Sequence, residues 1–307
     1  MRNLEVHHSM TDAFTEATSQ SLRFHLGAKG RSDLTFVQYR EDFLRFYEWL
    51  GGGEDAALRA VTRKDIERYM SELRRTDGGE LAPATRRHHF AGLRGFFKWY
   101  AEVEGIPSPM LGMTGPQVPE TSKDIVSVGQ VRNALLWLDR RQQYRNAALV
   151  SLLFETGMRV SEACGLRWDA IDFRGQVVNL AKTKNGTVRT PPFESATARR
   201  LDLWNRRRPD KVVPWVFPGR QGNHLTRHGV LYVVTQVFRE HGLDHISPHD
   251  LRHSMATAFM DENPDGEATL MAVGGWNSVA MVRHYAKQGR DKRAIEDFRK
   301  RSPTGRL

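Results

Sequence analysis

Residues 105–124, GIPSPMLGMTGPQVPETSKD, divide the sequence into two parts. The stretch holds four prolines and three glycines, and its apolar residues follow neither a helical nor an alternating pattern. Proline removes a main-chain donor and glycine weakens regular structure, so no long helix or strand is expected to cross it. We predict an extended linker, centred on residues 108–122, between two folded domains. The chain of 307 residues is long enough for about two domains of usual size.

The first part, residues 11–107, carries apolar residues at helical spacing. In residues 33–52 the apolar positions that share one helix face are Phe36, Tyr39, Phe43, Phe46 and Leu50. Two more helices are expected, one beginning at Thr62 as N-cap and one at Thr85. We therefore predict a bundle of about four helices. Basic residues alternate with aromatic ones on the last of them, which fits either a solvated face or a surface for nucleic acid: Arg86, Arg87, His88, Arg94 and Lys98.

The second part, residues 123–307, mixes helical and strand patterns. Helical spacing covers residues 128–141, 145–168, 230–242, 247–262 and 266–288, and the second of these breaks at Thr156 and Gly157. Residues 175–193 have apolar arms on both sides of a Lys-Asn-Gly turn, which is typical of a β-hairpin. The fold class expected for the whole chain is mainly α with a small β-sheet, made of an N-terminal helical bundle and an α+β domain.

Charge narrows the class of partner. The chain has 46 lysines and arginines against 36 acidic residues, a formal charge of +10. Residues 11–107 contain 15 of each sign, whereas residues 108–307 contain 30 basic and 20 acidic residues. This excess favours a nucleic acid partner, with its main footprint in the second part. No apolar run is long enough for a membrane span or a signal peptide, so we expect a cytoplasmic protein without a membrane partner.

Basic residues at the start of one predicted helix suggest a binding site for an anion or a metal. His249, Arg252 and His253 lie at the start of a helix that Ser247 and Pro248 begin. Two histidines four residues apart could bind a metal, but the pattern lacks the glutamate of metalloproteases and any cysteine cluster. An arginine at a helix start suits a phosphate better, because helix amides and a guanidinium both favour an anion.

Arg159 follows a glycine in an apolar stretch, and we expect its side chain to be largely buried. A buried guanidinium needs a partner. The sequence leaves three candidates open, namely Glu162, Asp169 and a phosphate oxygen. The single cysteine, Cys164, lies in the same stretch, so no internal disulfide can form and a buried, inert thiol is expected.

Three dispersed segments together resemble the tyrosine recombinase, or phage integrase, family. TGMRVSEACGLRWDAID is similar to its first arginine box, PHDLRHSMAT to its His-x-x-Arg-His box, and VGGWNSVAMVRHYAK to the segment with its tyrosine nucleophile. The segments occur in the family's order, and the N-terminal bundle resembles its core-binding, DNA-binding domain. The resemblance implies a core-binding domain at 11–107 and a catalytic domain with a C-terminal tail at 123–307. Few residues precede the first helix, so we expect the two-domain form without an arm-binding domain.

The family's catalytic positions fall on six residues of this chain, and the resemblance implies their roles: Arg159, Lys184, His249, Arg252, Trp276 and Tyr285. Trp276 stands nine residues before Tyr285, where many relatives have histidine, and its indole N–H can donate to a phosphate oxygen but cannot transfer a proton. Lys184 is preferred as general acid because of its spacing to Arg189, and Lys182 is the alternative. His253 and Glu162 are expected to support the site.

The implied activity is site-specific DNA recombination. Tyr285 would attack double-stranded DNA and form a 3′-phosphotyrosyl link, without metal, ATP or other cofactor, in a homotetramer on two DNA sites. The tail, residues 291–302, is amphipathic and could pack in its own protomer or on a neighbour. An accessory protein is a further candidate partner. Two other functions stay open, a type IB topoisomerase and a non-catalytic DNA-binding regulator, and so does the choice among phage integration, chromosome-dimer resolution and a mobile element.

Overall fold

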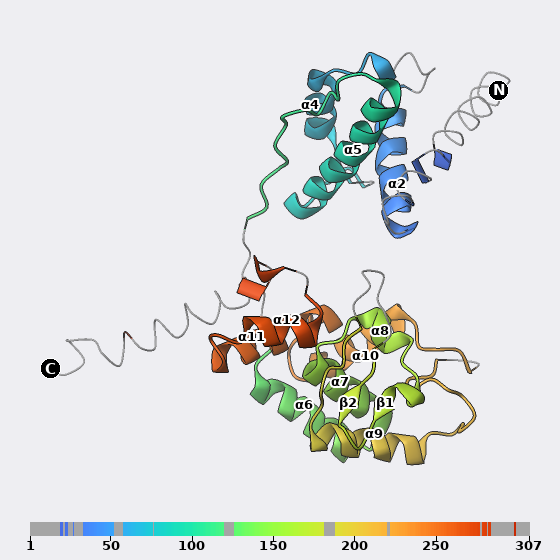
Figure 1. Cartoon of the computed structure of the whole chain (residues 1–307), viewed down its shortest axis with the longest axis vertical. Helices are drawn as coiled ribbons and strands as arrows, with labels where there is room; N and C mark the ends of the chain where they lie inside the picture. The colour runs from blue at the N-terminus through green and yellow to red at the C-terminus, as the bar shows by residue number, and fades with distance from the viewer. Residues whose placement is uncertain are drawn as a thin grey trace. The chain divides into compact units, whose positions relative to one another are not determined.

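The computed structural model describes residues 33–51, 58–75, 77–119, 126–180, 188–219, 222–276, 278–280 and 282–283, with a few single positions elsewhere. The chain forms two compact units, Met1–Thr121 and Ser122–Leu307. Helices make up most of both units and the second also holds a two-stranded sheet (Figure 1), which confirms the predicted fold class. None of the helices in the described ranges is long and apolar enough to cross a membrane.

The first unit is built from α2 (Asp33–Trp49), α4 (Arg63–Glu72) and α5 (Pro83–Glu104). Aromatic side chains dominate its core. Phe43 of α2 stacks on Phe96 of α5 with ring centroids 3.9 Å apart, and Phe46 meets Tyr69 of α4 edge to face. Offset and edge-to-face pairs of this kind add to the free energy of burial. The predicted apolar face of the first helix is confirmed, since its members are buried or pack against this core.

One of the two predicted helix starts in this unit is right. Thr62 caps α4 and forms a capping box with Asp65, whose carboxylate accepts the Thr62 N–H at 2.9 Å. The start at Thr85 is wrong, because α5 begins at Pro83 with Ala82 as its N-cap. Proline has no N–H to leave unsatisfied in the first turn and holds the preceding residue extended, so it starts the helix earlier.

Part of the proline- and glycine-rich stretch packs in the first unit. Gly105 ends α5 in the left-handed conformation, with φ of 65°. Beyond it, Met110 and Met113 are buried in the aromatic core, and the Arg94 guanidinium donates to the Met113 carbonyl. These contacts hold the chain against α5 for several residues after the helix ends.

The second unit contains α6 (Val128–Arg140), α7 (Tyr144–Thr156), α8 (Val160–Cys164), α9 (Ser195–Arg207), α10 (Arg227–Arg239), α11 (Pro248–Glu262) and α12 (Glu267–Gly274). α7 packs against α6, α9 and α11. Its residues 147–153 are all buried, as expected for a helix that is apolar on every side. Figure 1 shows α11 and α12 side by side. α9 was not predicted from the sequence.

The predicted hairpin arms pair, and a short strand extends them. Val177 pairs with Pro192 and Leu180 with Arg189 in antiparallel bridges. In addition β1 (Ile171–Asp172) pairs with β2 (Val177–Val178), in the register Ile171 to Val178. The predicted turn of the hairpin, with Lys182 and Lys184, lies outside the described residues.

Candidate active site

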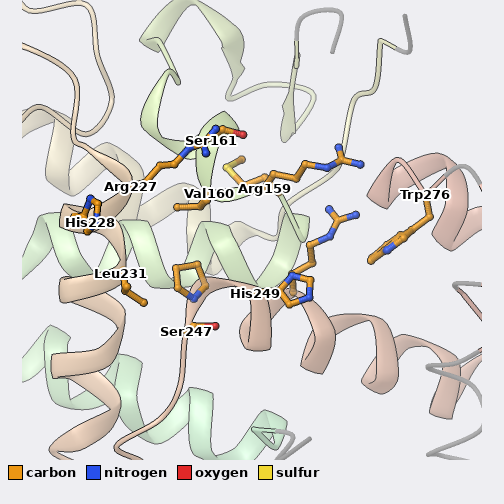
Figure 2. A pocket seen from close by; sticks show the side chains of 12 residues that line it. Arg159, Val160, Ser161, Arg227, His228, Leu231, Ser247, His249 and Trp276 are labelled. Atoms are coloured by element: carbon orange, nitrogen blue, oxygen red, sulfur yellow. The ribbon is translucent and has the colours of Figure 1, made fainter. Parts of the chain in front are cut away.

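A cavity of about 520 Å³ in the second unit brings four of the six predicted catalytic residues together. Its lining includes Arg159, His249, Arg252 and Trp276. Figure 2 shows Arg159 reaching towards the Trp276 side of the pocket, while His228 lies at the other end. The other two predicted residues, Lys184 and Tyr285, lie outside the described residues.

Arg159 stands between two helices at the first turn of α8. Gly157 ends α7 with φ of 55°, and this left-handed residue turns the chain so that Arg159 becomes the N-cap of α8. The Glu162 carboxylate accepts the Arg159 main-chain N–H at 2.6 Å and its Nη1 at 3.1 Å. Arg159 Nη2 donates to the Gly275 carbonyl at 2.7 Å.

The expectation that Arg159 is largely buried is wrong, because 42% of its side chain is exposed. The glycine break places its main chain at a helix end, and the side chain then runs along the pocket. Of the two protein partners considered, Glu162 is the one that pairs with Arg159, while Asp169 pairs with Arg167. The exposed part of the guanidinium can still meet an anion in the pocket.

Arg252 is buried on α11, with 5% of its surface exposed. The predicted start at Ser247 and Pro248 is confirmed, since Ser247 caps the helix and Pro248 is its first residue, and Ser247 also forms a capping box with Asp250. The Arg252 guanidinium donates to the Gly157 carbonyl through Nη1 and to the Gly274 carbonyl through Nη2 at 2.7 Å. Both acceptors are neutral, so these bonds orient the guanidinium without neutralising its charge.

Trp276 stacks on Arg252. The guanidinium carbon lies 3.8 Å from the centre of the indole ring, and only 5% of Trp276 is exposed. Such a contact attracts a cation to the ring face. Gly275, with φ of 68°, ends α12, and a Cβ on Gly274 would lie 1.7 Å from the indole ring. The two glycines therefore make the turn and the space that let the indole reach Arg252.

His249 is the second residue of α11, and its side chain is exposed at the pocket. The positive end of the α11 dipole lies at this first turn, so it favours an anion beside His249. His253, one turn further on, is buried. Within the described ranges, no three His, Cys, Asp or Glu side chains gather closely enough to hold a metal ion.

Three further basic residues at or near the pocket were not predicted as site residues. Arg227 and His228 line it from the first turn of α10. Arg189 is buried behind it, where its Nη2 pairs with Glu162 and its Nη1 donates to the Val273 carbonyl. Burial lowers the pKa of Arg189, and the Glu162 carboxylate opposes that shift. In the sequence, Arg189 served only as the residue whose spacing selects Lys184, five positions earlier.

Cys164 is buried, as predicted. Burial raises the pKa of its thiol, although the positive charge of Arg227 acts in the opposite direction. A thiol held in its neutral form is a poor nucleophile, which fits a structural residue.

Two arginines, a histidine and a helix N-terminus lie around one pocket, and their positive charge suits an anion such as a phosphate group. An anion placed there would meet cations and N–H donors on several sides. A helix-rich unit with such a pocket, preceded by a helical unit in a chain of formal charge +10, is the arrangement expected of enzymes that break and rejoin DNA strands.

Comparisons with known families place the chain within that class. Residues 127–291 match the phage integrase family, and residues 22–103 match the phage integrase N-terminal SAM-like domain. The chain belongs to the phage integrase family and is an enzyme of the tyrosine recombinase type. The resemblance seen in the three sequence motifs is therefore confirmed.

Individual relatives agree. Tyrosine recombinase XerC of Xylella fastidiosa (strain M23) is 27% identical over 240 residues, which cover 77% of this chain and 80% of the relative. Tyrosine recombinase XerC of Roseiflexus sp. (strain RS-1) is 29% identical over 263 residues, 82% of each chain.

Solved structures share the fold. The XerH site-specific recombinase bound to palindromic difH substrate aligns with a TM-score of 0.70 and 19% identity, covering 92% of this chain and 84% of that one. The Tn1549 transposon integrase in complex with transposon right end DNA aligns with a TM-score of 0.68 and 16% identity, covering 91% and 99%.

Proposed function

We propose that this protein is a site-specific DNA recombinase that cleaves and rejoins double-stranded DNA through a 3′-phosphotyrosyl intermediate. The observation that carries the proposal is the gathering of Arg159, His249, Arg252 and Trp276 around one pocket. Its domains are proposed as 11–107 for core binding, 108–122 as a linker whose Met110 and Met113 pack on the first unit, and 123–307 for catalysis. The proposal places it in the cytoplasm, where DNA is accessible.

The chemistry follows from the charges. A phosphodiester repels nucleophiles because it is anionic, and negative charge grows on its non-bridging oxygens as phosphorus becomes five-coordinate. Arg159 and Arg252 would balance this charge, and His249 would donate a hydrogen bond. The Tyr285 oxygen forms the new bond to phosphorus, the bond to the 5′-oxygen breaks, and that oxygen leaves as a hydroxyl. In the second step a 5′-hydroxyl of the partner strand attacks the phosphotyrosyl link and releases Tyr285.

Two protons must move. A phenol has an ordinary pKa of about 10, so the Tyr285 hydroxyl needs nearby positive charge or a base to become a nucleophile. The leaving 5′-oxygen needs an acid, for which we propose Lys184, with Lys182 as the alternative. The described residues beside the lysine segment support this assignment, because Leu180 and Arg189 pair at its base and Arg189 reaches Glu162.

Exchange between two DNA sites requires several active sites, so we propose a homotetramer on DNA. The amphipathic tail, residues 291–302, is the proposed contact between protomers. An accessory protein could select the order of strand exchange, and the titration of purified protein alone on its DNA would show whether one is needed.

The experiment that tests the proposal begins with the selection of a binding site from a randomised duplex library. The protein is then mixed with that site, nicked near the cleavage point so that the released fragment diffuses away, without metal or ATP. A covalent adduct on a denaturing gel, and joined products from two intact sites, are expected. An adduct with relaxation of supercoiled DNA but no joined products would indicate the topoisomerase alternative. Binding without any adduct would indicate the regulator.

The stacking of Trp276 on Arg252 gives a testable prediction. Trp276→Ala removes the ring from the cation, a contact worth about 2 kcal/mol when it is shielded from water, so the single-turnover cleavage rate should fall by roughly 30-fold. Trp276→Phe keeps a ring face and should cleave within about tenfold of the wild type. A phenylalanine variant as slow as the alanine variant would show that the indole N–H, rather than stacking, is what cleavage needs.

The basic face of α5 gives a second prediction about DNA binding. Arg87 and Lys98 are exposed on it and line a hollow together with Gly95 and Tyr39, whereas Arg94 stacks on Phe90. Arg87→Ala with Lys98→Ala should reduce the slope of log affinity against log salt by about one for each DNA phosphate that is no longer neutralised. Fluorescence anisotropy at several salt concentrations measures this slope.

The matched control is Arg75→Ala, because Arg75 is 60% exposed in the same unit but pairs with Asp77 at 2.9 Å. Its salt slope should equal that of the wild type. If the salt slope of the α5 double variant is unchanged, these basic residues do not contact DNA phosphates and only form a solvated helix face.

A further inference from the structure

The Glu162 carboxylate is shared between two arginines. Its Oε1 accepts Arg159 Nη1 at 3.1 Å, and its Oε2 accepts both the Arg159 main-chain N–H and Arg189 Nη2. Arg189 shows 4% exposure, whereas the Arg159 side chain is 42% exposed at the pocket. We infer that Arg189 is a positioning residue for the DNA-cleavage reaction, acting through Glu162 and the turn before Trp276; this inference rests on the proposed function.

The first part of this role is electrostatic. One carboxylate can balance one guanidinium, so the group of Glu162, Arg159 and Arg189 keeps a net charge of about +1. Without Arg189, the full carboxylate charge would act on Arg159, at the short distance of an ion pair partly shielded from solvent. Arg159 would then offer less positive charge to a phosphate, even though every atom of Arg159 is still present.

The second part is geometric. Arg189 Nη1 donates to the Val273 carbonyl, and Arg159 Nη2 donates to the Gly275 carbonyl at 2.7 Å. A Cβ on Gly275 would lie 2.9 Å from Arg189 Cδ and 3.5 Å from Arg159 Nη1. Both arginines therefore hold the turn at Gly275, and the next residue, Trp276, is the one that stacks on Arg252.

Arg189 also stands at the base of the segment that carries the candidate general acids. Its carbonyl accepts the Leu180 N–H at 3.0 Å, and residues 181–187 lie between these two paired positions. A single buried residue thus connects the base of the lysine segment, through its main chain, with Arg159 and the turn before Trp276, through its side chain.

Stability alone does not explain such a residue. Removing a guanidinium from water is costly, and a buried ion pair often contributes little net stability compared with an apolar replacement. A methionine of similar length would fill much of the same space. We therefore expect Arg189→Met to fold and to bind DNA, and to be defective in cleavage.

The test compares single-turnover cleavage of the nicked DNA substrate by the full-length wild type, Arg189→Met, Glu162→Gln and the double variant. Arg189→Met should cleave about 10²-fold more slowly, with DNA affinity close to that of the wild type. In the double variant the carboxylate charge is gone, so Arg159 regains its charge and cleavage should rise at least about tenfold above Arg189→Met. A residue needed only for folding would not show this rescue.

Arg200→Met is the matched control. Arg200 of α9 forms an ion pair with Asp139 of α6 through its Nε and Nη2 atoms, its side chain is 18% exposed, and it does not line the pocket. Its cleavage rate should not change. Arg189→Lys is the second variant if Arg189→Met fails to fold. One ammonium group cannot reach both Glu162 and the Val273 carbonyl, so about tenfold slower cleavage is expected.

Wild-type cleavage by Arg189→Met, a double variant no faster than Arg189→Met, or full activity of Arg189→Lys would each overturn the inference. Absence of an adduct with the wild-type protein itself is a different result, because it would contradict the proposed function and not the role of Arg189.

Discussion

Tyr285→Phe should abolish the covalent protein–DNA adduct and lower strand cleavage by about 10⁴-fold or more. The reason is that phenylalanine keeps the ring and loses only the oxygen that would bond to phosphorus. DNA affinity and thermal stability should stay close to the wild-type values. A denaturing gel of the nicked substrate, run without metal or ATP, measures the adduct directly.

The matched control for this variant is Tyr232→Phe. Tyr232 is 66% exposed on α10 and does not line the pocket, so the loss of its hydroxyl should leave the adduct unchanged. An adduct still formed by Tyr285→Phe would assign the nucleophile to another side chain, and mapping of the DNA-linked peptide would identify it.

Arg252→Lys should lower the cleavage rate by about 10²-fold, and Arg252→Ala by about 10³-fold. Arg252 contacts the Gly157 carbonyl, the Gly274 carbonyl and the Trp276 ring at the same time. A lysine ammonium is a single point of charge that cannot reach all of these groups and still face a phosphate. Single-turnover cleavage at saturating protein separates this effect from DNA binding.

Thermal unfolding of the same variants is the necessary control, because Arg252 is buried and its removal to alanine leaves a cavity. Arg200→Lys, a change at a mostly buried arginine outside the pocket, should cleave normally. A folded Arg252→Lys variant that cleaves as fast as the wild type would remove Arg252 from the catalytic set.

Local patterns in the sequence predicted much of the fold. The start of α11 was predicted correctly, because helix capping depends on only a few neighbouring residues, here Ser247 and Pro248. The predicted helix start at Thr85 was wrong for a reason that is also local, because Pro83, two residues earlier, begins the helix instead. α9 was missed, and its apolar positions, Leu201 and Trp204, became meaningful only as contacts with the core of the second unit.

The candidate site was predicted in part. Four residues that suit a phosphate were recognised from motifs, and the structure brings those four into one pocket. The prediction that Arg159 is buried was wrong, because the direction of its side chain after the glycine break is set by the tertiary structure. Arg189 was overlooked as a site residue, since nothing in its neighbours in sequence shows that it meets Glu162, 27 residues earlier.

The sequence by itself determined the helical faces, the two-part organisation, the excess positive charge and the chemical types available to the site. These properties depend on residue identity and short-range spacing, which the order of residues specifies directly. Only the tertiary structure decided which groups meet: Arg159 with a carbonyl 116 residues away, Arg252 with one 95 residues away, and the indole with the Arg252 guanidinium. The physical reason is that such contacts require two left-handed glycine turns, at Gly157 and Gly275, and a packed core to bring distant segments within hydrogen-bonding distance.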